Sequence, residues 1–195
     1  AAEFWPGPLT LVAPIRAESG IADLVTAGLA TLAVRVPAHP LARALLAAFG
    51  EPVAAPSANP SGQVSPTTAA HVTQALGGRI AAVLDGGACP VGLESTILGF
   101  DGDYPDARPV LLRPGGLGVE AVEAALSCVV GLDHGEAITA PGQLASHYAP
   151  GVRLRLEAAC PEPGEGWLGF GPDSALDSGG ITGPALNLSS TGDLA

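Results

Sequence analysis

Two arginines, Arg35 and Arg113, are the clearest candidates for chemistry, because each lies where a short apolar segment ends. A guanidinium in such a position either extends into solvent from its apolar stem or binds a carboxylate or phosphate as a planar fork. The residues alone leave both interpretations open for Arg35. Two such forks make the binding of an anionic ligand the first functional hypothesis.

Small hydroxyl and amide side chains form a second set of candidates. Ser57 and Asn59 follow a short apolar run in the stretch 54–62, and the range 94–96 opens another apolar segment with Glu, Ser and Thr. Such groups at strand ends can bind a ligand while letting it approach the backbone. The alternatives are a Pro/Ser/Asn turn for the first stretch and a solvent-facing edge strand for the second.

No protein nucleophile with an adjacent base can be assigned from the order of residues. The four histidines are not spaced as metal ligands, and the three cysteines, Cys89, Cys128 and Cys160, lack zinc or disulfide spacing. We predict no protein-built metal site and interpret the cysteines as small buried apolar residues. This set suits a reaction whose nucleophile belongs to the substrate, with catalysis by positioning and charge neutralisation.

Composition narrows the class of protein. The chain has 195 residues, 47% of them hydrophobic, and a formal charge of −11. That charge argues against direct binding of tRNA or other nucleic acid, because phosphate contacts need clustered cations. All eight basic residues are arginines. No apolar run approaches a membrane span, and the first residues lack the basic-then-apolar layout of a signal peptide, so we expect a cytoplasmic protein. The absence of methionine and the abrupt ends suggest a fragment.

The hydrophobic pattern predicts alternating strands and helices, which is typical of an α/β fold. Leucines and alanines at helical spacing predict a helix over 39–49 that is capped by Gly50, and Ser65 to Thr68 precede a second helix. The expected strands span 9–15, 31–36, 52–55, 80–84, 91–98 and 108–112, and the expected helices span 39–49, 69–76 and 119–126.

Three regions are expected along the chain. Residues 1–128 form the first domain, and 129–151 form a Gly/Pro-punctuated linker. That linker contains the motif Ser-His-Tyr-Ala-Pro at 146–150, which is unusual for a purely passive tether. Residues 152–195 begin a second α/β domain, with strands expected at 152–156, 167–170 and 185–188.

Five motifs occur in the order in which one family carries them. They are Phe-Trp-Pro-Gly-Pro-Leu-Thr at 4–10, Ala-Val-Arg-Val-Pro at 33–37, Ala-Pro-Ser-Ala-Asn at 55–59, Gly-Leu-Glu-Ser-Thr at 92–96 and Leu-Arg-Pro-Gly at 112–115. Together they resemble the YrdC-like family of threonylcarbamoyl-AMP synthases, and the linker motif resembles its long, two-domain branch. The resemblance implies a twisted open mixed sheet with flanking helices, followed by the start of a Rossmann-like domain.

The resemblance also implies a reaction and a set of site residues. L-Threonine, bicarbonate or CO2, and ATP, with Mg²⁺, would give threonylcarbamoyl-AMP and pyrophosphate, and a downstream tRNA-modifying transferase complex would use the product. The implied ATP-binding residues are Ser57, Asn59, Ser65, Arg113, Tyr148 and Thr10, and the implied threonine-binding residues are Arg35, Ala55 and Ser95.

One departure from the family pattern matters. The family carries a Lys-x-Arg motif upstream of the first strand, and this chain contains no lysine. We therefore expect this fragment alone to be inactive, even if its parent protein is a synthase. The rival hypothesis is a non-catalytic module of the same fold that binds nucleotide or RNA.

Overall fold

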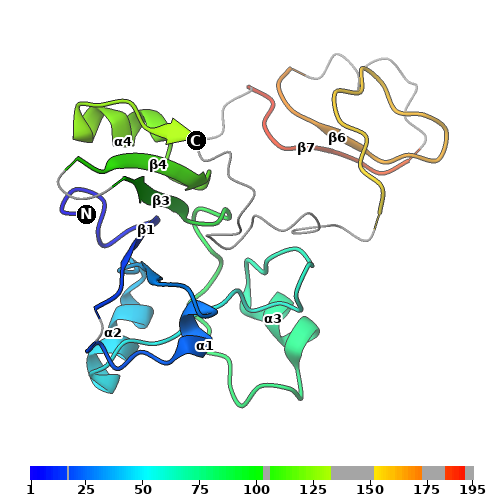
Figure 1. Cartoon of the computed structure of the whole chain (residues 1–195). Coiled ribbons are helices and arrows are strands. Elements are labelled where there is room, and N and C mark those ends of the chain that lie inside the picture. The colour runs from blue at the N-terminus through cyan, green and yellow to red at the C-terminus, as the bar shows by residue number, and fades with distance from the viewer. Residues whose placement is uncertain (17, 103–105, 133–151, 173–182, 192–195) are drawn as a thin grey trace. The chain divides into compact units, whose positions relative to one another are not determined.

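The computed structural model describes residues 1–16, 18–102, 106–132, 152–172 and 183–191. The chain divides into two compact units, Ala1–Ala149 and Pro150–Ala195, and each is described by itself (Figure 1). The predicted linker motif at 146–150, including Tyr148, lies outside the described residues.

The first unit is built on a five-stranded sheet with the order β2-β1-β3-β4-β5. Its strands are β1 (Leu9–Pro14), β2 (Thr31–Val34), β3 (Thr96–Asp101), β4 (Arg108–Arg113) and β5 (Gly131–Leu132). The pairs β1/β2 and β3/β4 are antiparallel, whereas β1/β3 and β4/β5 are parallel. The predicted mixed α/β architecture is therefore confirmed. Because β5 pairs with β4, this sheet continues to Leu132.

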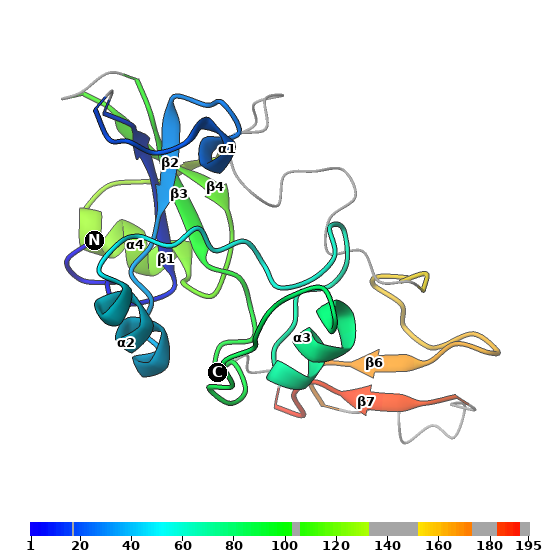
Figure 2. The ribbon, with the colours of Figure 1, turned by 90° about the horizontal axis from the view of Figure 1, so that it is seen from below.

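The core lies mainly between this sheet and helix α4 (Val119–Leu126). Figure 2 shows α4 beside the strands of this sheet. Leu9 and Leu98 pack with Val122 of the helix, and all three are at most 3% exposed. Val12 and Ile97 form a separate, smaller cluster. Adjacent residues of a strand face opposite sides of a sheet, which explains why Ile97 and Leu98 belong to different clusters.

The remaining helices are α1 (Asp23–Thr26), α2 (Pro40–Phe49) and α3 (Ala69–Leu76). The predicted caps of the two longer helices are confirmed: Gly50 ends α2 in the left-handed region with φ 79°, and the Thr68 side chain accepts a hydrogen bond from the His71 N–H at the start of α3. Neither α2 nor α3 contains a buried residue. None of the described helices is long and apolar enough to cross a membrane.

Two predicted strands, 52–55 and 80–84, are wrong, since both segments are irregular and exposed. Val53 is 46% exposed and Leu84 is 61% exposed. Prolines at 52 and 56 remove backbone donors on either side of the first segment. Neither segment pairs with any described strand, so its apolar side chains have no sheet to join.

Two further expectations also need correction. The strand predicted over 91–98 begins only at Thr96, after the irregular segment 91–95, and it continues to Asp101. The cysteines Cys89, Cys128 and Cys160 are exposed rather than buried, because they lie in turns and irregular segments outside the sheet and helices that build the core.

The second unit contains two short parallel strands, β6 (Trp167–Gly169) and β7 (Ala185–Asn187). The strand predicted over 152–156 is wrong, because this segment is exposed and irregular. Arg155, in the middle of this segment, forms an ion pair with Glu165, and the distance between Arg155 Nη2 and Glu165 Oε2 is 2.5 Å.

Candidate functional site

The candidate site lies at one edge of the first sheet, which we call the polar edge and define by Thr10, Arg35, Glu94, Ser95 and Arg113. Strand directions explain how these residues meet. Parallel pairing places the amino ends of β1 and β3 together, and antiparallel pairing brings the carboxyl ends of β2 and β4 to the same edge. The polar edge therefore lies where β1 and β3 begin and where β2 and β4 end.

Two buried hydroxyl groups form the centre of the polar edge. Thr10 and Ser95 are 8% and 7% exposed, and their Oγ1 and Oγ atoms are hydrogen bonded at 2.7 Å. The residues are 85 positions apart in the chain. The β1/β3 register brings them together, since Leu9 lies opposite Thr96.

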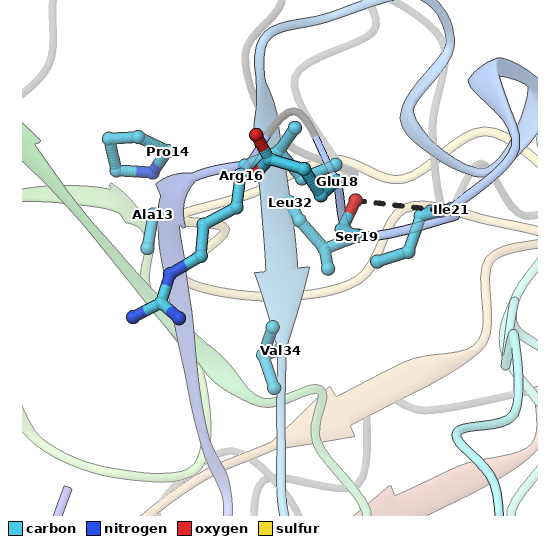
Figure 3. Close-up of a pocket in the computed structure, with 9 residues that line it drawn as sticks. Ala13, Pro14, Arg16, Glu18, Ser19, Ile21, Leu32 and Val34 are labelled. Carbon is cyan, nitrogen blue, oxygen red and sulfur yellow. Dashed lines mark hydrogen bonds between the residues drawn. The ribbon is translucent and has the colours of Figure 1, made fainter.

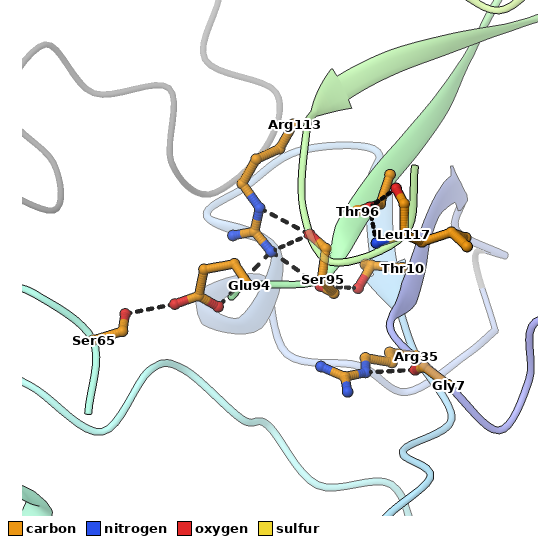
Figure 4. A network of polar contacts seen from close by, with 9 residues as sticks. All are labelled: Gly7, Thr10, Arg35, Ser65, Glu94, Ser95, Thr96, Arg113 and Leu117. Carbon is orange, nitrogen blue, oxygen red and sulfur yellow. Dashed lines mark hydrogen bonds and ion pairs between the residues drawn. The ribbon is translucent and has the colours of Figure 1, made fainter. Parts of the chain in front are cut away.

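The guanidinium group of Arg113 donates hydrogen bonds to both the backbone and the side chain of Ser95. Its Nε and Nη2 donate to the Ser95 carbonyl oxygen at 3.1 and 2.7 Å, and Nη2 also donates to the Ser95 hydroxyl at 3.0 Å (Figure 4). The turn that follows Arg113 packs closely, because a Cβ on Gly115 would lie 2.4 Å from the Glu94 carbonyl oxygen. Glycine at this position thus allows the chain after Arg113 to lie against the entry of β3.

Glu94 is a site residue to which the sequence assigned no role. Its Oε1 accepts a hydrogen bond from the Ser65 hydroxyl at 2.5 Å, and its Oε2 lies 4.0 Å from Arg113 Nη2 (Figure 4). The only signal in the sequence is an acid directly before Ser95, and an acid at a strand entry commonly faces water.

Arg35 follows β2 and lies near the same cluster. Its Nε donates to the Gly7 carbonyl oxygen at 2.9 Å. Partial burial lowers the pKa of Arg35, the nearby Arg113 lowers it further, and Glu94 opposes both effects. The guanidinium stays charged at neutral pH because an arginine pKa lies far above 7. The polar edge thus holds two cations and one carboxylate.

The other predicted residues lie on the loop before α3. Ala55 and Ser57 are exposed, and Asn59 Nδ2 donates to the carbonyl oxygens of Pro60 and Gln63 at 2.9 and 3.0 Å. The Asn59 Oδ1 atom is buried and has no hydrogen-bond partner among the described residues. An acceptor of this kind is costly unless a ligand or water satisfies it.

A cavity of about 320 Å³ connects this loop with the polar edge. Its lining includes Ser57, Ser65 and Glu94, together with apolar side chains such as Val72 and Leu84. The structure therefore brings three groups of predicted residues into one region: the Thr10–Ser95–Arg113 cluster, Arg35 beside it, and the loop residues joined to it through Ser65. It leaves Ala55 exposed, and Tyr148 is outside the described residues.

A second cavity, of about 430 Å³, lies at the opposite end of β1 and β2 (Figure 3). Ala13, Leu32 and Val34 contribute apolar surface there, and Arg16 and Glu18 contribute one charge of each sign. None of the predicted site residues lines it. Throughout the described ranges, no group of three or more His, Cys, Asp or Glu side chains could hold a metal ion.

A five-stranded mixed sheet with helices around it defines this part of the chain as an α/β domain. Residues 1–115 match the family model Sua5_yciO_yrdC, which is described as "Telomere recombination". The chain belongs to this Sua5/YciO/YrdC family.

Relatives with assigned names are similar over most of this chain. The threonylcarbamoyl-AMP synthase of Bacillus subtilis is 47% identical over 163 residues, which make up 82% of this chain and 46% of that protein. The synthase of Pyrococcus abyssi is 42% identical over 159 residues, or 79% and 45% of the two chains. The chain thus spans about half the length of these relatives.

A solved structure shows the same fold. The crystal structure of P. abyssi Sua5 complexed with L-threonine matches with a TM-score of 0.72 and 38% sequence identity, and the match covers 91% of this chain and 48% of that one. The resemblance of the sequence to the YrdC-like family and the expected mixed α/β fold are both confirmed.

Proposed function

We propose that this chain is the greater part of the nucleotide- and amino-acid-binding domain of a threonylcarbamoyl-AMP synthase. The observation that carries the proposal is the polar edge itself, in which two arginines and two buried hydroxyls converge without a protein nucleophile among the residues described there. The similarity to named synthases and to a structure solved with L-threonine supports it.

The proposed reaction uses the substrate's own amine as the first nucleophile. The threonine nitrogen attacks CO2, supplied as such or from bicarbonate, and loses a proton to give a carbamate. A carbamate oxygen then attacks the α-phosphorus of ATP, the bond to the bridging oxygen breaks, and pyrophosphate leaves with its electron pair. The protein contributes position and charge, which suits a site built from hydrogen-bond donors and cations.

The two arginines take different parts in this proposal. Arg35 binds the threonine carboxylate as a planar fork, near the hydroxyl of Ser95 and the backbone of Ala55. Arg113 offsets charge on the phosphates, with Thr10 held beside it through Ser95.

The loop before α3 completes the nucleotide site in the proposal. Ser57 and Ser65 line the cavity of about 320 Å³, and Asn59, which the family resemblance assigns to ATP, lies on the same loop. Mg²⁺ binds mainly to phosphate oxygens with one or two protein carboxylates. One carboxylate, Glu94, lines this cavity, so the donors present fit an ion held chiefly by the nucleotide.

Pyrophosphate release by the full-length protein tests the proposal. We expect release to require both threonine and bicarbonate, and we expect mass spectrometry to detect threonylcarbamoyl-AMP as the product for use by a tRNA-modifying transferase. Nucleotide binding without threonine-dependent release would instead support the rival, a non-catalytic binding module. The charge of −11 already disfavours the RNA-binding form of that rival.

A further inference from the structure

Glu94 contacts two parts of the candidate site, the loop before α3 and Arg113 at the end of β4. Its Oε1 accepts from Ser65 at 2.5 Å, and its Oε2 lies 4.0 Å from Arg113 Nη2. Ser65 belongs to the loop 57–68, whereas Arg113 ends β4. We propose that Glu94 is a positioning residue that holds Ser65, and with it the loop 57–68, against the polar edge where the nucleotide binds. This inference rests on the proposed function.

The hydrogen bond to Ser65 matters more in this role than the ion pair with Arg113. The ion pair is long, and the Glu94 side chain is 33% exposed, so solvent screens the attraction. Arg113 is in any case oriented by its bonds to Ser95. The bond from Ser65 is short and has an ionised acceptor, which makes it the stronger contact.

Two described hydrogen bonds tie the loop to distant segments of the unit: the Ser65 bond to Glu94, and a backbone bond in which the Cys89 N–H donates to the Thr67 carbonyl oxygen at 2.8 Å. The loop's other described side-chain hydrogen bonds stay within it or reach α3: Asn59 bonds to Pro60 and Gln63, and Thr67 and Thr68 bond to His71. The Ser65 bond instead reaches across 29 residues to the entry of β3. Among the described hydrogen bonds of the loop only this one reaches the polar edge, so losing it would loosen Ser65 from that edge while the Thr67 backbone bond remains.

Two uncharged variants of Glu94 separate the effect of its hydrogen bond to Ser65 on ATP affinity from the effect of its charge. Both Glu94→Gln and Glu94→Ala remove the charge of this side chain, so any effect of that charge on bound ATP or its metal ion is lost equally in the two variants. Glutamine keeps an oxygen that can accept from Ser65, whereas alanine does not. We expect Glu94→Ala to bind ATP about fivefold more weakly than Glu94→Gln, the factor that one net hydrogen bond contributes. Threonine affinity should differ by less than about twofold between the two variants.

Calorimetry with ATP alone, on the full-length protein, measures this difference. In a Ser65→Ala background the two Glu94 variants should bind ATP equally, because the group that Glu94 positions is gone. Glu51→Ala, which removes an exposed carboxylate of the same unit, serves as the matched control. Equal affinities of the two variants in the wild-type background, or a difference that persists without the Ser65 hydroxyl, would overturn the proposal.

Hydrogen exchange of the ligand-free protein provides a test that does not depend on ATP. Amides in peptides covering 57–68 should exchange about fivefold faster in Glu94→Ala than in Glu94→Gln, while β4 peptides should not change. If the wild-type protein binds no ATP, the proposed function fails and this exchange result alone decides the role of Glu94. If Glu94→Ala does not fold, Ser65→Ala should show the faster exchange and Glu94→Gln should match wild type. Equal exchange in all folded variants refutes the positioning role.

Discussion

Replacing Thr96 by valine should destabilise the first unit by about 2–3 kcal/mol. The Thr96 hydroxyl donates to the Leu117 carbonyl oxygen at 2.6 Å and accepts from the Leu117 N–H at 3.0 Å. Thr96 is fully buried, with 0% exposure. Valine keeps the shape but leaves both Leu117 backbone groups without a partner, and each unsatisfied buried group costs about 1–3 kcal/mol. Leu117 is half-buried, so water recovers part of that loss.

Urea unfolding followed by tryptophan fluorescence is the assay. The chain has two tryptophans, and a Trp167→Phe background leaves Trp5 as the reporter of the first unit. Trp5 is a suitable probe because it packs against the core and its Nε1 donates to the Leu9 carbonyl oxygen at 2.7 Å. The expected loss corresponds to a fall in melting temperature of roughly 5–10 °C.

Two control variants make this result decisive. Thr73→Val removes a hydroxyl that donates to Ala69 on the exposed helix α3, and it should change stability by no more than about 0.5 kcal/mol. Thr96→Ser keeps the hydroxyl and loses one methyl group, so it should cost about 1 kcal/mol. If Thr96→Val costs no more than Thr73→Val, or Thr96→Ser costs as much as Thr96→Val, the two hydrogen bonds do not hold this turn.

Four further predictions concern the site and the second unit. Arg113→Ala should weaken ATP binding by about 1.5–3 kcal/mol by calorimetry, and an unchanged affinity would remove Arg113 from the site. Arg35→Lys should raise the KM for threonine while that for ATP barely moves, because a point charge cannot replace a planar fork; equal effects would indicate a structural role. Tyr148→Ala in the full-length protein should lower the threonylcarbamoyl-AMP recovered per ATP consumed, if Tyr148 shields the product from water; a wild-type ratio and turnover would contradict this. The hydrogen bond from Arg155 lowers the pKa of Glu165 from 4.5 to about 2. The ionised Glu165 therefore stabilises the folded state above pH 4.5, and this stabilisation is lost as the pH falls towards 2. Glu165→Gln should remove that part of the acid dependence of unfolding, and an unchanged acid profile would show that the pair contributes nothing.

The helices were predictable because their signals are local. Gly50 and Thr68 mark helix ends through their own backbone preference and side-chain chemistry, without reference to distant residues. Strands differ, since their hydrogen bonds go to a neighbour that the local sequence does not specify. The apolar runs 52–55 and 80–84 have strand composition, yet they pair with no described strand and stay irregular.

The sequence singles out residues that the structure brings together at the polar edge, but it does not predict their contacts. The motifs point to Thr10, Ser95 and Arg113 individually, but the 2.7 Å bond between Thr10 and Ser95 depends on the register of β1 and β3. Motif spacing contains no information about that register. The contact between Glu94 and Ser65 was unpredictable for a similar reason, because the path of the loop before α3 decides it.

Ser95 and Thr96 are adjacent in the chain but serve different purposes: Ser95 belongs to the candidate site, whereas Thr96 contributes to stability. Both carry hydroxyls at the same strand entry, and in sequence they look like one polar site. Successive side chains point to opposite faces, so Ser95 meets Thr10 and Arg113 while Thr96 bonds to Leu117, a residue of the core that includes α4. The Thr96→Val variant should therefore shift the unfolding curve while the folded molecules keep the ligand affinity of the wild-type protein. A change in both would mean that the turn at Leu117 also sets the position of the Arg113 fork.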